Sequence, residues 1–307
     1  MHKKASKLLE TIKNIARKTK NKKIIPELYV REFEDLINKN QYKELIEKYK
    51  KSNHTIKHLS KLQELQIQEY IAKSYRFLHK FDKAIELHKN ILTSNNMQNQ
   101  HFKIISYCEL AYINFEINDF RKSLSYYKKG FKLAKKILTK NEQACFYIRL
   151  SFTYSSLYKF NKAKTYLEKA RVVMHNNSGL DCEFSINSAF SYFYYKKGNL
   201  WNALLYCKSK NSRLSDYNFE QITTLTKVLT RLGYYSQTIH ILKKVKFKNN
   251  KYFSYKNLFT INIIKAISYY NKGSIKKAIT LIEDNIKKEK EFNNKKFYLN
   301  YFYRIYF

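Results

Sequence analysis

Residues 72–88 read AKSYRFLHKFDKAIELH, and residues 266–282 read AISYYNKGSIKKAITLI. In both stretches a buried-type small residue, alanine, is followed by a tyrosine three positions later and by a second alanine twelve positions later. A turn-forming position lies between them, and it holds His79 in the first stretch and Gly273 in the second. Because the two stretches are far apart in the chain, their common pattern indicates a repeated structural unit.

The second alanine of this pattern recurs at nearly constant spacing along the chain. The residues at this position, here called the anchors, are Leu45, Ala84, Ser123, Ala163, Ala203, Thr238 and Ala278. Subtracting neighbouring numbers gives spacings of 39, 39, 40, 40, 35 and 40 residues. Self-similarity at such a period is typical of a solenoid, in which each unit stacks on its neighbours.

Each unit has the apolar pattern of two short helices. In residues 64–92, one stripe at helical spacing consists of Leu65, Ala72 and Tyr75. The second stripe consists of Phe81, Ala84, Ile85, His88 and Ile91. Small residues allow the two helices to approach closely, and larger residues fill the groove between them. A single hairpin cannot bury both stripes, so the sequence predicts that neighbouring hairpins stack.

The position five residues before each anchor, here called the turn slot, supports the same register. It holds Asn40, His79, Asn118, Tyr158, Gly198, Gly233 and Gly273. Three of the five glycines of the chain therefore fall in this slot. Glycine and asparagine adopt the left-handed backbone conformation most easily, and helices commonly end on such a residue. We predict that a first helix ends at each turn slot.

The pattern at Ala72, Tyr75, His79, Phe81 and Ala84 resembles that of the tetratricopeptide repeat, over roughly residues 30–290. The resemblance implies an all-α fold, a right-handed α-solenoid of about seven helical hairpins. The usual repeat of that family is shorter, so these units carry longer helices or loops. We expect a basic N-terminal helix over residues 1–26, the solenoid over residues 27–290, and an aromatic C-terminal helix over residues 291–307.

The charge of the chain leaves two interpretations open. The formal net charge is +36, from 60 basic and 24 acidic residues. Such an excess favours a polyanionic partner, either a nucleic acid or an anionic membrane surface. The alternative is compositional drift in an AT-rich genome, since the chain is also rich in Asn, Ile, Tyr and Phe. Drift explains the abundance of lysine better than it explains the shortage of acidic residues.

Motifs for chemistry are missing from the sequence. There is no glycine-rich phosphate loop and no HExxH metal motif, and His54 and His58 are expected to be surface histidines. We therefore predict no catalytic residues, no metal and no cofactor. The four cysteines, which lack CxxC spacing, are expected to be buried free thiols: Cys108, Cys145, Cys182 and Cys207. With no apolar run of membrane-spanning length, we expect a cytoplasmic protein of a bacterium or its phage.

The tetratricopeptide resemblance implies that the first helix of each hairpin lines a groove for an extended peptide or a partner helix. Positions one, four and five after the small residue would face this groove. From them we predict a ligand-binding set: Lys73, Arg76, Tyr112, Tyr192, Tyr195, Lys227, Arg231 and Asn271. Cations around aromatic residues suit a short peptide with apolar side chains and a carboxylate or acidic end. The alternative is that these aromatic residues belong to the core.

The C-terminal segment is unusually apolar for the end of a solenoid, which normally needs a polar cap. Such a segment either folds back on the last hairpin or buries against another chain. We favour a homodimer contact, made by Phe297, Tyr298, Tyr301, Phe302 and Ile305. The basic N-terminal segment could dock on a membrane or DNA, but we expect it to pack on the first repeat.

Extended repeats without an enzyme domain resemble the peptide-sensing regulators, the Rap-type proteins and the phage arbitrium receptors. The chain departs from their DNA-binding members because no helix-turn-helix can be placed. The resemblance implies a non-enzymatic regulator whose groove binds a short signalling peptide and switches a partner interaction. Two alternatives remain at the level of sequence: a protein–protein scaffold, and a basic solenoid that binds DNA or RNA through lysine-rich faces.

Overall fold

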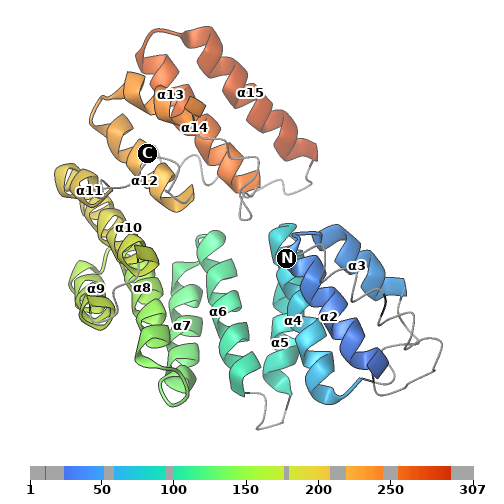
Figure 1. The fold of residues 1–307 in the computed structure, drawn as a ribbon. Coiled ribbons are helices and arrows are strands. Elements are labelled where there is room, and N and C mark those ends of the chain that lie inside the picture. Colours follow the sequence, from blue (N-terminus) through green and yellow to red (C-terminus); the bar gives the residue numbers. More distant parts are fainter. Residues whose placement is uncertain are drawn as a thin grey trace. The chain divides into compact units, whose positions relative to one another are not determined.

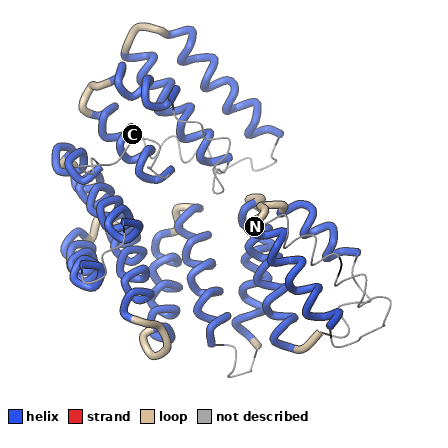
Figure 2. Tube along the Cα trace, in the orientation of Figure 1, coloured by secondary structure: helices blue, strands red, loops and turns tan. Residues whose placement is uncertain are grey.

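The fold is taken from a computed structural model, which describes residues 24–51, 59–94, 100–175, 180–207, 219–244 and 255–291, besides Thr11. Across these ranges the chain forms fourteen helices and no strand. Figure 2 shows the helices in blue, with the described turns between them in tan. The helices form seven consecutive hairpins (Figure 1). The predicted all-α repeat fold with about seven hairpins is therefore confirmed.

The bounds of the helices follow the predicted register. The first helices of the hairpins are α2 (Ile24–Asn38), α4 (Lys61–Phe77), α6 (Gln100–Glu116), α8 (Lys140–Ser156), α10 (Leu180–Lys197), α12 (Phe219–Arg231) and α14 (Tyr255–Asn271). The second helices are α3 (Tyr42–Lys51), α5 (Phe81–Thr93), α7 (Phe120–Ala134), α9 (Phe160–His175), α11 (Leu200–Cys207), α13 (Tyr235–Lys244) and α15 (Ile275–Glu291).

The chain divides into two compact units. Unit 1 consists of residues 1–116 and 125–137, and unit 2 consists of residues 117–124 and 138–307. Within unit 1, α4 packs against α2, α5 and α6. Within unit 2, α10 packs against α8 and α12, and α14 packs against α12 and α15. First helices of successive hairpins therefore lie next to one another inside each unit.

Every turn slot has the backbone conformation that the sequence predicts. All seven residues have positive φ, from 56° at His79 to 84° at Gly198. At His79, the amide of the next residue, Lys80, donates to the carbonyl of Tyr75, and the amide of His79 itself donates to that of Arg76. This pair of bonds is the Schellman arrangement, which satisfies carbonyl groups at the helix end and reverses the chain. The same pair of bonds is found at the ends of α2, α8, α10, α12 and α14.

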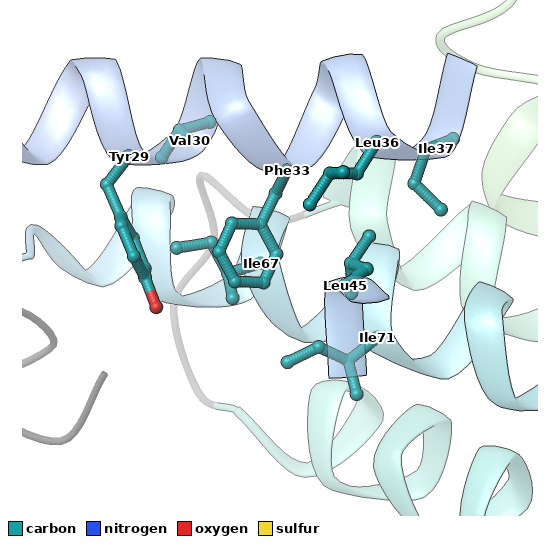
Figure 3. Close-up of a cluster of buried hydrophobic side chains, with 8 residues drawn as sticks. All are labelled: Tyr29, Val30, Phe33, Leu36, Ile37, Leu45, Ile67 and Ile71. Carbon is teal, nitrogen blue, oxygen red and sulfur yellow. The ribbon is translucent and has the colours of Figure 1, made fainter. Parts of the chain in front are cut away.

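The two small-residue positions of each repeat are buried, which explains why small side chains occupy them. Ala84, Ser123, Ala163, Ala203 and Thr238 have no exposed surface. The positions twelve residues before the anchors are equally enclosed, as at Ala72 and Ala111. The first hairpin differs because large residues, Phe33 and Leu45, take the two positions. Figure 3 shows how the side chains of α2, Phe33 among them, point towards Ile67 and Ile71 of α4.

The cysteines correct one sequence prediction. Cys207 is buried, its sulfur lies 2.8 Å from the hydroxyl of Ser191, and burial raises the pKa of its thiol to about 11. Cys108 is half-buried, however, and Cys145 is exposed on α8, so the prediction of burial was wrong for Cys145. All three are free thiols. The side chain of Cys182 lies outside the described residues.

Both predicted terminal helices fall mainly outside the described residues. Almost all of residues 1–26 lie outside the described residues, and so do the five proposed dimer residues between Phe297 and Ile305. The dimer contact therefore stays a prediction. Among the helices that the structure describes, none is both long enough and apolar enough to cross a membrane.

Candidate ligand-binding face

The first helices carry the predicted ligand-binding residues, which fall into both units. Lys73 and Arg76 lie on α4 and Tyr112 lies on α6, in unit 1. The other five residues belong to unit 2: Tyr192 and Tyr195 on α10, Lys227 and Arg231 on α12, and Asn271 at the end of α14. We call the two sets the unit 1 face and the unit 2 face.

The unit 1 face is organised around Arg76. Its Nε lies 2.5 Å from Oε2 of Glu109 on α6, and both side chains are mostly buried, with 13% and 19% of their surface exposed. The guanidinium carbon lies 4.1 Å from the ring centre of Phe77 and 5.0 Å from that of Tyr112. Arg76 is thus neutralised by a carboxylate of its own chain and packed on two rings.

Two buried titratable groups interact electrostatically with this ion pair. Burial raises the pKa of Glu69 to about 7; the charge of Lys73 opposes the shift, and that of Glu109 adds to it. Burial lowers the pKa of His88 to about 4, so its imidazole is neutral at pH 7. Nδ1 of His88 lies 3.2 Å from Oγ of Ser106, while Nε2 has no hydrogen-bond partner within the described ranges. Glu69 belongs to α4, and the contact between His88 and Ser106 joins α5 to α6.

The unit 2 face has aromatic rings held in place by neighbouring helices. The ring of Tyr192 lies 5.0 Å from that of Phe152 on α8, and its hydroxyl lies 2.8 Å from Oγ of Ser156. The Nζ of Lys196 lies 5.9 Å from the ring centre of Tyr192 and 5.7 Å from that of Tyr158. Tyr192 therefore both packs α10 on α8 and underlies a cation.

Arg231 takes a similar place on the next pair of helices. Its guanidinium carbon lies 5.4 Å from the ring centre of Tyr195, which joins α12 to α10. Arg231 is exposed, and no ion pair formed by the described residues includes it. Its guanidinium is therefore available to an external anion.

The two faces differ sharply in charge. In unit 1, α4 contains Glu64 and Glu69, and α6 contains Glu109 and Glu116. In unit 2 the acidic residues of the first helices stand near the helix starts, at Glu142 in α8, Asp181 and Glu183 in α10 and Glu220 in α12; residues 143–156, 186–197 and 221–231 contain none, and neither does α14. Burial, with a smaller contribution from the charge of Lys243 on α13, lowers the pKa of Lys265 on α14. The unit 2 face is the more favourable place for an anion.

The structure changes how several predicted residues are understood. Arg76 and Tyr112 form an internal contact with Glu109 rather than an open site. The side-chain amide of Asn271 donates to the carbonyl of Ile267 in its own helix. Sequence reasoning missed the pairing role of Glu109, although a lone acidic residue inside the apolar run of α6 was a signal. Tyr195 and Arg231 do meet, and Lys227 on α12 is half-buried.

Two shallow hollows of the surface lie elsewhere, beside helix turns. One, of about 350 Å³, is lined by residues 40–44 and Leu78 in unit 1. The other, of about 410 Å³, is lined by residues 117–121 and Leu157 in unit 2. Neither contains a predicted ligand-binding residue. An elongated partner on the helix face, rather than a small molecule in a closed cavity, suits this surface.

No protein-family model matches the chain, and no curated protein matches it in sequence. Solved structures do match its fold. A Rap protein complexed with competence and sporulation factor is 13% identical, with a TM-score of 0.62 over 94% of this chain and 93% of that one. The chain has a tetratricopeptide-type fold. NprR in complex with its cognate peptide NprX is 15% identical, with a TM-score of 0.58 over 88% of this chain and 81% of that one.

A third similar structure is itself described as a tetratricopeptide repeat protein. It is a tetratricopeptide repeat protein from Parabacteroides merdae, 12% identical, with a TM-score of 0.56 over 92% of this chain and 98% of that one. The three similarities together confirm the predicted fold and its likeness to Rap-type proteins. They are similarities of fold, and a shared fold does not by itself assign a function.

Proposed function

We propose that this chain is a non-enzymatic cytoplasmic regulator that binds a short signalling peptide on its first helices and thereby switches a partner interaction. The observation that carries the proposal is the unit 2 face, where the half-buried Lys196 and the exposed Arg231 lie near tyrosine rings, in stretches of α10 and α12 that contain no acidic residue. Two proteins of similar fold were solved with their ligands, competence and sporulation factor and the peptide NprX. The similarity of fold supports the proposal that the first helices of this chain also bind a peptide.

A switch without catalysis follows from the architecture. In a stack of hairpins each hairpin contacts its neighbours, so small changes at successive contacts add up along the stack. A peptide that lies across α10 and α12 would favour the spacing of these two helices that fits it best. Only a ligand with different affinities for two arrangements can shift their populations. The peptide would then change the surface that a partner protein recognises.

The test uses the full-length protein and a pool of random hexapeptides. We expect affinity selection followed by mass spectrometry to recover a subset of peptides, and hydrogen exchange to slow in residues 186–197 and 221–231 when they bind. Slower exchange confined to other parts of the chain would place the site elsewhere. Failure to enrich any peptide would contradict the proposal and favour the scaffold alternative, in which partner binding needs no peptide.

The second candidate function, nucleic-acid binding, is favoured by one helix. Residues 120–141 contain no acidic residue. Within unit 1, five lysines on and just after α7 have exposed side chains: Lys128, Lys129, Lys132, Lys135 and Lys136. Their spacing of three to four residues places several on one side of the helix. Such a row of cations is complementary to a phosphate backbone.

A salt titration separates this candidate from the first. If α7 binds phosphates, the affinity for a labelled double-stranded DNA or RNA falls steeply as salt rises, and Lys128→Glu with Lys132→Glu reduces the slope. The pair Lys162→Glu and Lys164→Glu on α9 provides a control of equal charge change. Equal weakening by both pairs, or retention only on anionic vesicles, would argue against a nucleic-acid site on α7.

A further inference from the structure

We propose that the unit 2 face recognises a carboxylate of its ligand, and that Arg231, supported by the ring of Tyr195, is the residue that binds it. This inference rests on the peptide-binding function proposed above and specifies the chemical group that the site selects. Lys227, on the same helix, contributes additional positive charge. Two arginines of this chain, Arg76 and Arg231, have similar surroundings and different partners.

Arg76 and Arg231 occupy related places. Each lies at the C-terminal end of a first helix, four residues after Ala72 in α4 and five residues after Thr226 in α12. Each guanidinium lies near a tyrosine ring of an adjacent first helix, at 5.0 Å from Tyr112 and at 5.4 Å from Tyr195. A ring restricts the guanidinium to one plane and leaves its N–H groups along the edge for a bidentate acceptor.

The two arginines differ in what occupies that edge. In unit 1 the carboxylate is supplied by the chain, because Oε2 of Glu109 lies 2.5 Å from Nε of Arg76. In unit 2, α10 and α12 offer no acidic residue in 186–197 or 221–231, and Arg231 makes no ion pair with any residue that the structure describes. A ligand carboxylate would complete at Arg231 the arrangement that Glu109 completes at Arg76.

Charge in the surroundings strengthens the same preference. Lys196, Lys197, Lys227 and Arg231 belong to the two acid-free segments, so the local field attracts an anion before contact is made. The planar guanidinium then suits a carboxylate, because the two carboxylate oxygens match two guanidinium N–H groups. The carboxylate could come from the C-terminus of a peptide or from an Asp or Glu side chain, which share this chemistry.

The experiment distinguishes these sources with three hexapeptide pools. The first pool omits Asp and Glu and has free C-termini, the second includes Asp and Glu and has amidated C-termini, and the third omits Asp and Glu and is amidated. We expect the full-length protein to retain the first pool, the second or both, according to the source, and to retain the third much more weakly.

Variants assign the effect to the residue. Arg231→Ala should lower retention of the carboxylate pools by about ten- to a hundred-fold, the usual range for a lost hydrogen-bonded charge contact. Arg231→Lys keeps the charge but lacks the planar fork, so its retention of the carboxylate pools should lie between that of the parent and that of Arg231→Ala. Arg171→Ala is the matched control, because Arg171 also lies in unit 2 near a ring, that of Phe190, but is already paired with Glu168. Since Arg231 is exposed, its variants should melt like the parent.

The outcomes separate this inference from the function on which it rests. If Arg231→Ala retains the carboxylate pools as well as the parent does, or if the third pool binds equally well, peptide binding stands and carboxylate recognition by Arg231 is wrong. If the parent retains none of the pools, the proposed function fails together with the inference. Loss of retention in Arg171→Ala as severe as in Arg231→Ala would also overturn the assignment, since it would show a diffuse charge effect.

Discussion

Nε of Arg76 lies 2.5 Å from Oε2 of Glu109, and this ion pair joins two successive first helices under very little exposed surface. The same guanidinium packs on the rings of Phe77 and Tyr112. A pair in such a place stabilises the stacking of α4 on α6 only while both partners are present. Either charge alone would be left nearly buried without compensation.

Glu109→Gln is therefore expected to destabilise the protein by about 3 kcal/mol, the usual cost of breaking a buried pair on one side. Chemical denaturation measures the loss. The double variant Arg76→Met with Glu109→Gln should recover a large part of it, because no unpaired charge remains. Additive effects of the two changes would show that the contact contributes no coupling. Since Arg76→Ala should also lower stability, weaker ligand binding by that variant would not identify a ligand contact.

Glu69 gives the protein a specific dependence on pH. Its pKa in the folded chain, about 7, is above the unfolded value of 4.5. The folded state therefore binds more protons between these values, so this stabilisation is fully present below pH 4.5 and is lost as the pH rises through about 7. Glu69→Gln imitates the protonated form and should exceed the parent in stability at pH 8, by roughly 3 kcal/mol at most.

Melting curves between pH 5 and 8 test this expectation. The difference between Glu69→Gln and the parent should grow with pH, while Glu86→Gln, an exposed change on α5, should follow the parent. A difference that is constant over the range would mean that Glu69 does not titrate there.

The turn slots allow a test of backbone strain alone. Gly198 has φ of +84°, and a Cβ built there would meet no atom within 4 Å. Gly198→Ala should therefore cost about 1 kcal/mol through the left-handed conformation and not through a clash. Gly198→Asn should cost less, because asparagine tolerates this region better. Unfolding by urea measures both, and an alanine variant as stable as the parent would contradict the explanation.

These examples show which features the sequence could reveal. The turn slots and the anchors obey local rules of backbone conformation and side-chain volume, so their spacing was enough to predict seven hairpins. Asn40 and Gly273 have positive φ because the helix must end there, whatever packs around them. Ala84 is small because α4 lies against it. Rules of this kind need no knowledge of distant residues.

The candidate site was only partly predictable, because it depends on which side chains meet across helices. The spacing of the repeats was enough to place Arg76 and Arg231 in related positions. It could not show that the carboxylate of Glu109 lies beside Arg76, whereas Arg231 has no such partner among the described residues. That contact requires the rotation of α6 against α4. The exposure of Cys145 was missed for a similar reason, since it depends on which side of α8 its neighbours cover.

The predicted dimer can be tested without structural knowledge of the segment that would make it. Residues 297–307 contain five tyrosines and phenylalanines in their first seven positions, among them Phe297, Tyr298 and Phe302. We expect sedimentation to show a dimer for the full chain, and a monomer or an insoluble product when residues 297–307 are deleted. A full-length chain that remains monomeric at high concentration would favour a capping role for this segment.

The register of the repeats predicts that a charged side chain at an anchor position destabilises the hairpin. Ala84 is the anchor of the second hairpin and has no exposed surface. Ala84→Asp would place a carboxylate in the close contact between α4 and α5, where neither water nor a cation can compensate it, and should cost about 3 kcal/mol or more. Lys89→Asp, at an exposed position of the same helix, is the matched control and should lower the melting temperature far less. If Ala84→Asp melts at the same temperature as the parent, the anchors do not lie at the helix contacts, because a buried contact between two helices could not accept an unpaired carboxylate without loss of stability.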